Sequence, residues 1–232
     1  MTSTGTAPAG EAHSSLRERK KLATRRALRR VALTLAAERG WANVTVEDIA
    51  EAANVSPRTF FNYFPSKEAV LFGSDPDKAA ALRERIAAEA PGEPVLEALR
   101  VVMASNAQAV AEEWTELGGD PADWLHRTRS ARGDPHVRAA FAAQTAMIER
   151  TIAEGVAERL GTDLDRDPYP GLLAATAAAV FRSSLAFWAD THGTVPLGSL
   201  IDLAFRALAD GLPEHTALRR VTTDVTGRRD HH

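Results

Sequence analysis

Two helix-start signals lie close together in the first third of the chain. Thr45 carries the side-chain oxygen of an N-cap and precedes Glu47 and Asp48, whose negative charges favour the positive end of a helix dipole. Ser56 is a second N-cap, and Pro57 after it takes a first helical position, where a missing N–H costs nothing. The spacing therefore predicts two short helices joined by a tight turn, which is a helix-turn-helix unit.

A longer helix is expected before this pair. From Leu16 onward, apolar residues recur at intervals of three and four on one face, arginines fill the opposite face, and Gly40 provides the end. We predict a disordered arm over residues 1–15 and a helix-turn-helix DNA-binding domain over residues 16–72.

The net charge of −3 hides an asymmetry between the two parts of the chain. Residues 1–72 hold 11 Lys or Arg against 7 Asp or Glu, whereas the remaining 160 residues hold 17 against 24. The positive excess is concentrated in residues 17–30. This distribution suggests a small basic module on an acidic body, although a solvated helix face would have the same composition.

The third predicted helix presents side chains that can read bases in the major groove of DNA. Arg58 can bind guanine, Asn62 can pair with adenine, and the methyl group of Thr59 can contact a thymine methyl. Hydroxyl and ammonium groups near the helix starts suit phosphates, although Ser56 could serve as a cap alone and the aromatic side chains could belong to the core. The predicted DNA-binding residues are Thr45, Ser56, Pro57, Arg58, Thr59, Phe61, Asn62, Tyr63 and Lys67.

Residues 45–68, TVEDIAEAANVSPRTFFNYFPSKE, closely resemble the DNA-binding segment of TetR-type (TetR/AcrR-like) transcriptional regulators. The resemblance implies a homodimer, a palindromic operator and a small-molecule effector. Family members often carry tyrosine where Phe61 stands and histidine where Tyr63 stands, both as phosphate donors. Because Phe61 has no hydroxyl group, one phosphate bond is expected to be lost or moved, while Tyr63 can still donate.

The rest of the chain is predicted to be helical, so that the fold class is all-α. Apolar residues at helical spacing run from about residue 76 to residue 212, and no alternating Val/Ile/Thr run marks a strand. We predict a helical effector-binding and dimerisation domain over residues 73–215 and a flexible tail over residues 216–232.

The last two predicted helices are apolar on more than one face. Such helices must be buried on several faces, and a second copy of the chain is the simplest cover for the surplus face. A central helix buried within a monomer would show the same pattern. The predicted dimer-interface residues are Phe181, Leu185, Trp188, Leu200 and Phe205.

An effector cavity is expected among the middle helices, because ligand pockets combine mostly apolar walls with a few placed polar groups. The same residues could equally be ordinary core. The composition of the wall suggests a hydrophobic or aromatic effector. The predicted ligand-binding residues are Met103, Trp114, Trp124, Phe141, Gln144 and Phe181.

Enzyme chemistry finds little support in the sequence. The chain has no cysteine, no His-Glu-x-x-His pair, no glycine-rich phosphate loop and no Gly-x-Ser-x-Gly elbow. We therefore expect no catalytic site, no metal and no cofactor. The longest apolar run is too short for a membrane span and no signal peptide is evident, so a cytoplasmic protein is expected.

The sequence thus predicts a homodimeric transcriptional regulator, most simply a repressor that a small effector releases from a palindromic operator in double-stranded DNA. Two other classes stay open. One is a helical small-molecule or lipid-binding protein without a DNA role, and the other is an all-α enzyme acting on an acyl or aromatic substrate.

Overall fold

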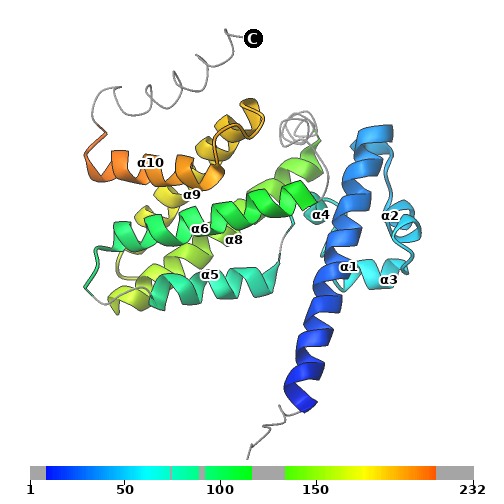
Figure 1. Cartoon of the computed structure of the whole chain (residues 1–232), viewed down its shortest axis with the longest axis horizontal. Helices are drawn as coiled ribbons and strands as arrows, with labels where there is room; N and C mark the ends of the chain where they lie inside the picture. Colours follow the sequence, from blue (N-terminus) through cyan, green and yellow to red (C-terminus); the bar gives the residue numbers. More distant parts are fainter. Residues whose placement is uncertain (1–8, 74, 89–91, 117–133, 213–232) are drawn as a thin grey trace, which may run out of the picture. The chain divides into compact units, whose positions relative to one another are not determined.

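The computed structural model describes residues 9–73, 75–88, 92–116 and 134–212. Every regular element in these ranges is helical, as the sequence predicts (Figure 1). The chain divides into two compact units, Met1–Ser74 and Asp75–His232, which we call the N-terminal unit and the C-terminal unit. The predicted tail over residues 216–232 lies outside the described residues.

The N-terminal unit contains the predicted helix-turn-helix. A long helix, α1 (Ala9–Arg39), is followed by a short 3₁₀ helix, η1 (Trp41–Asn43), and by α2 (Val46–Ala52), α3 (Pro57–Phe61) and α4 (Ala69–Phe72). Helix α1 packs against η1, α2 and α4, and α2 packs against α3. The apolar positions predicted for α1 provide much of the core, together with side chains from the later helices. The fully buried residues of this core include Leu28, Ala32, Ile49, Phe60 and Phe64.

Helix α1 begins earlier than the sequence analysis predicts. Its first residue is Ala9, so residues 9–15, which we assigned to a disordered arm, are helical, and residues 1–8 lie outside the described residues. The physical reason is the cooperativity of helix formation. Once a helix is nucleated, each further residue adds a hydrogen bond at a much smaller entropic cost than that of nucleation.

Two arginines of α1 are buried, although the sequence pattern places the arginines of this helix on the face opposite the apolar residues. Arg25 and Arg29 are each only 7% exposed. The guanidinium carbon of Arg25 lies 5.0 Å from the centre of the Phe64 ring, and Arg29 lies against Gly73. Arginine can occupy such places because its long aliphatic stem covers apolar surface while its planar head stacks on an aromatic ring.

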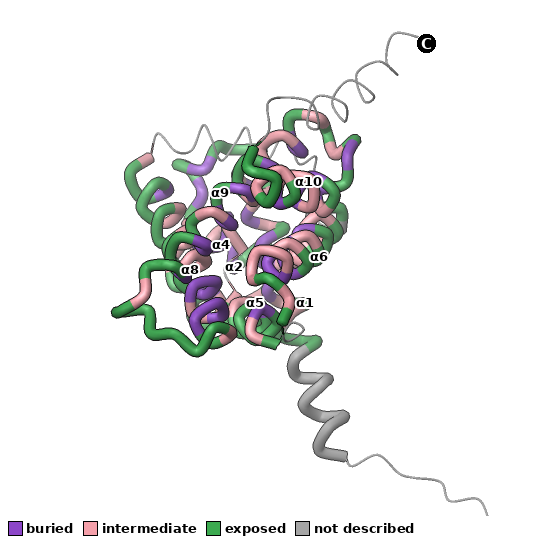
Figure 2. Tube along the Cα trace, turned by 90° about the vertical axis from the view of Figure 1, so that its left-hand side faces the viewer, coloured by how far each residue is buried: buried purple, intermediate pink, exposed green. Residues whose placement is uncertain are grey.

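The C-terminal unit is a bundle of helices. It comprises α5 (Pro76–Ala88), α6 (Val95–Glu116), α8 (Pro135–Leu160), α9 (Tyr169–Asp190) and α10 (Leu197–Ala209). Their contacts close a ring in the order α5, α8, α9, α10, α6 and back to α5, and α6 also contacts α9 across it. Buried positions recur along each of these helices (Figure 2).

Two glycines allow the helices of this bundle to approach closely. A Cβ atom added at Gly155 of α8 would lie 3.0 Å from the backbone oxygen of Arg83 in α5. A Cβ atom added at Gly198 of α10 would lie 2.9 Å from the backbone oxygen of Ala104 in α6. A larger residue at Gly198 would force the α6 and α10 backbones to shift, and one at Gly155 would require its neighbours to give by a few tenths of an ångström.

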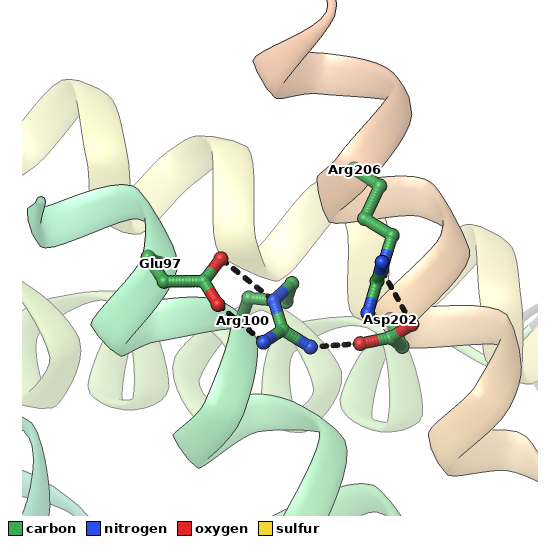
Figure 3. Close-up of polar contacts among 4 residues, drawn as sticks. All are labelled: Glu97, Arg100, Asp202 and Arg206. Atoms are coloured by element: carbon green, nitrogen blue, oxygen red, sulfur yellow. Dashed lines mark hydrogen bonds and ion pairs between the residues drawn. The ribbon is translucent and has the colours of Figure 1, made fainter.

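A chain of alternating charges joins α6 to α10 (Figure 3). Arg100 donates to both carboxylate oxygens of Glu97 and to Asp202, and Asp202 also accepts from Nε of Arg206 at 2.9 Å. The hydrogen bond from Arg100 lowers the pKa of Glu97. The Arg100 side chain is only 18% exposed, so Arg100 is the most buried of these four charged side chains.

Helix α9 has a length and an apolar composition that could cross a membrane, and 44% of its apolar window is buried inside the chain. It packs on α8 and α10. A helix covered on several sides by its own chain needs an apolar composition for that reason alone, so the feature is that of a core helix.

Candidate nucleic-acid interface

The start of α2 is locked by a reciprocal cap. The backbone N–H of Asp48 donates to the Thr45 hydroxyl oxygen at 3.1 Å, and the backbone N–H of Thr45 donates to the Asp48 carboxylate at 2.9 Å. The Thr45 hydroxyl also donates to that carboxylate at 2.6 Å. These hydrogen bonds lower the pKa of Asp48, with a smaller contribution from Arg39. The predicted N-cap is thus confirmed, and the hydroxyl hydrogen that we assigned to a phosphate is used within the chain.

The turn between α2 and α3 is tight. Asn54 takes a positive φ of 55°, and the backbone N–H of Val55 donates to the carbonyl of Ala50 at 2.9 Å. Asparagine tolerates this left-handed conformation better than most residues. Only four residues, 53–56, separate α2 from the next helix.

Ser56 caps α3 as predicted, and Pro57 takes the first helical position. The Ser56 hydroxyl oxygen accepts from the backbone N–H of Thr59 at 3.1 Å, and the two hydroxyl oxygens are 2.8 Å apart. Ser56 thus has a structural role as the cap of α3, and a phosphate contact would be a second role of the same side chain.

The described surface of α3 divides into a buried and an exposed side. Phe60, with Phe64 just after the helix, is completely buried, whereas Arg58, Phe61 and Asn62 are exposed. Pro57 is also exposed, while Thr59 and Tyr63 are partly exposed. The residues that we selected for reading bases therefore share the accessible side of the helix.

Lys67 has a role that the sequence analysis did not predict. Its ammonium group donates to the backbone oxygens of Val44 at 2.8 Å and Trp41 at 3.2 Å, and it lies 4.6 Å from the centre of a Trp41 ring. Lys67 therefore ties the segment after α3 to the segment that leads into α2. An ammonium group has three N–H donors, and these two bonds use two of them.

Trp41 completes this arrangement and was absent from our prediction. It is only 8% exposed and follows Gly40, whose φ of 75° ends α1. In the sequence, the burial of Trp41 is indicated only by its place as a large aromatic residue directly after a helix-ending glycine. Its pairing with a lysine 26 residues away could not be inferred from that sign.

The predicted dimer-interface residues divide into two groups. Trp188, Leu200 and Phe205 are buried within the single chain, which makes them part of its own core. Phe181 and Leu185 are partly exposed. The exposed side of α9 instead presents residues at intervals of three and four: Leu172, Ala175, Ala179 and Ser183.

The predicted ligand-binding residues come from three helices of the C-terminal unit. Met103 on α6 is buried, whereas Phe141 and Gln144 on α8 and Phe181 on α9 are partly exposed. Helix α9 contacts both α6 and α8, so the three helices that carry these residues pack on one another. Trp114 is part of α6, and Trp124 lies outside the described residues.

A helix-turn-helix carried by a small helical unit, followed by a separate helical bundle, defines a class of DNA-binding proteins. Comparison with known proteins agrees with this class. The model of bacterial regulatory proteins of the tetR family matches residues 28–72, and the model of the MftR C-terminal domain matches residues 93–213.

The chain is also similar to a curated relative over most of its length. The HTH-type transcriptional regulator TcmR of Streptomyces glaucescens is 36% identical over 204 residues, which cover 85% of this chain and 86% of the relative. The chain therefore belongs to the tetR family of bacterial regulatory proteins and is a transcriptional regulator.

The chain is similar in fold to a solved structure. The fatty acid degradation regulator FadR from Bacillus halodurans aligns with a TM-score of 0.51 at 18% identity, covering 80% of this chain and 98% of that chain. The TetR-family repressor FadR from Thermus thermophilus, in complex with lauroyl-CoA, is 29% identical with a TM-score of 0.49, covering 83% of this chain and 96% of that chain.

Proposed function

We propose that this regulator is a homodimeric repressor that binds a palindromic operator through α3 and is released by a small hydrophobic or aromatic effector. It acts by binding, without a catalytic step. The single observation that carries the DNA part is the exposed pair Arg58 and Asn62 on the accessible side of a capped helix. A guanidinium and an amide are the groups that bind guanine and adenine edges in the major groove.

DNA selection tests this function directly. The full chain is incubated with random double-stranded DNA, and bound sequences are amplified and sequenced. We expect enrichment of inverted repeats whose half-sites lie about 34–36 Å apart, because a two-fold dimer presents its recognition helices one DNA turn apart. No enrichment, together with no binding below about micromolar protein at low salt, would exclude a DNA role and favour a helical ligand-binding protein.

A matched pair of arginine variants tests the contact to bases. Arg58→Ala is expected to weaken operator binding by about 1–3 kcal/mol, the cost of losing a bidentate guanine contact. Arg85→Ala is the control, because Arg85 is an exposed arginine of α5 in the C-terminal unit. Equal operator affinity for the two variants would show that Arg58 does not contact a base.

The exposed side of α9 supports the proposed dimer. Leu172 is 63% exposed, and Ala175 and Ala179 continue its line with small side chains that permit close helix approach. Leu172→Arg is expected to shift the chain from dimer to monomer in analytical ultracentrifugation. Val101→Arg, at an exposed apolar position of α6, is expected to leave the mass unchanged.

The effector is proposed to bind in the region of Met103, Phe141, Gln144 and Phe181. Native mass spectrometry of the purified chain is the first test, because a retained small molecule would show as a mass increment. An effector that releases DNA must, by linkage, bind more weakly to the DNA complex by the same factor. Titration with and without operator checks this equality.

A further inference from the structure

The N-terminal unit leaves one large apolar side chain in solvent. Among residues 19–73, whose side chains the structure describes, Phe61 is the one exposed large hydrophobic residue, and its exposed fraction is 55%. The other phenylalanines at this end of the unit, Phe60 and Phe64, are completely buried. The outer face of the Phe61 ring therefore lies outside the core of the N-terminal unit.

The exposed ring is held in place from below. Phe61 packs on the buried Phe60 with ring centres 5.5 Å apart and ring planes at 89°, and Phe60 packs in turn on Phe64 at 5.7 Å. An edge-to-face pair is a favoured aromatic geometry. The outer surface of Phe61 is thus a supported apolar platform, which loses little conformational freedom when something packs on it.

Polar groups surround this platform. Arg58 lies three residues earlier and Asn62 directly follows, and both are exposed. Residues three apart are neighbours on a helix surface. On the major-groove edges of DNA, donors and acceptors alternate, and the apolar group among them is the C5 methyl of thymine.

We infer that Phe61 packs on a thymine methyl and makes each operator half-site require thymine at one position. This inference rests on the proposed DNA-binding function and adds a base preference to it. Thr59 was the sequence-based candidate for this contact. Thr59 is only partly exposed, whereas Phe61 is 55% exposed and has the larger side chain, so Phe61 offers the larger accessible apolar surface.

Uracil substitution isolates the methyl group, since deoxyuridine differs from thymidine only by its absence. The selected operator is synthesised with each thymine replaced in turn, and affinities are measured by fluorescence anisotropy. With about 0.8 kcal/mol for one buried methyl group, the parent should lose about fourfold in affinity at one thymine per half-site. Phe61→Ala should bind the thymine and uracil operators equally, and Phe61→Leu should keep part of the difference.

Two controls separate this contact from other effects. Thr59→Ser removes only the competing methyl group and should keep the full uracil effect, and thermal melts confirm that each variant is folded. Retention of the uracil effect in Phe61→Ala, its loss in Thr59→Ser, or its absence from every position in the parent would overturn the inference while DNA binding stands. Failure to select any operator would instead overturn the proposed function, and this inference with it.

Discussion

Replacing Lys67 by methionine tests the link between the two ends of the helix-turn-helix. Methionine keeps an unbranched side chain of similar length and removes the ammonium group. The variant loses two charge-assisted hydrogen bonds, to the backbone oxygens of Val44 and Trp41, and a cation–π contact with the Trp41 ring. It also leaves the Val44 carbonyl without this donor.

The magnitude follows from these contacts. Hydrogen bonds to a charged group contribute about 1.5–3 kcal/mol each, and a cation–π contact about 0.5–2 kcal/mol. Lys67 is only partly buried, and its bond to Trp41 is long at 3.2 Å. We therefore expect the loss of the two hydrogen bonds and the cation–π contact to lower the free energy of unfolding by about 2 kcal/mol in total. At about 4–8 °C per kcal/mol for a unit of this size, the melting midpoint of the N-terminal unit should fall by about 8–16 °C.

Calorimetry of the full chain measures this change. Lys20→Met is the matched control, since Lys20 is an exposed lysine of α1 and a surface substitution of this kind changes stability by at most about 0.5 kcal/mol. A Lys67→Met midpoint equal to the parent's would show that these contacts do not stabilise the N-terminal unit. The same variant should also lower the salt dependence of operator binding by about one unit, because the third N–H is proposed to meet a phosphate.

The remaining predictions concern packing, pH and charge. Gly198→Ala should destabilise the C-terminal unit by about 1–3 kcal/mol in urea unfolding, because the new Cβ would lie 2.9 Å from a backbone oxygen of α6. Gly171→Ala, whose Cβ would meet nothing within 4 Å, should instead stabilise by about 0.5–1 kcal/mol. Asp48 has a lowered pKa, so its stabilising effect should be present above about pH 4 and lost as the pH falls further. Asp48→Asn should therefore reduce stability at neutral pH and approach the parent in acid, as circular dichroism melts across pH will show. Arg100→Met should cost about 1–3 kcal/mol in urea unfolding because it leaves two carboxylates without their shared partner, against at most about 1 kcal/mol for the exposed Arg206→Met.

Local signals in the sequence predicted the helix-turn-helix well. The caps at Thr45 and Ser56 and the stop at Gly40 are decided by residues within three or four positions of one another, so that a linear pattern contains all the information needed. Phe60 and Phe64 stand four positions apart, a helical spacing that puts both on one face, and both are completely buried. These features confirm the fold class, and the position of the DNA interface stays a prediction.

Features that depend on distant contacts were predicted less well. The bonds of Lys67 join positions 26 and 23 residues apart, and no periodicity encodes them. The burial of Trp188 and Phe205 depends on how α9 and α10 pack in the bundle. An apolar stripe shows that a helix face is covered, and it does not show whether the cover is the same chain or a second copy.

The burial of arginines in α1 changes how the charge of the N-terminal unit should be interpreted. Residues 17–30 contain eight Lys or Arg, which a count of charges would assign to phosphates. Arg25 and Arg29 are buried, one over the Phe64 ring and the other against Gly73 at the end of α4, so both contact other residues of the N-terminal unit. Because salt dependence reports phosphates neutralised, the slope per half-site should be smaller than the count of basic residues. Replacing Arg25 should therefore lower the melting midpoint of the N-terminal unit more than it changes that slope, whereas the exposed Lys20 should show the opposite balance.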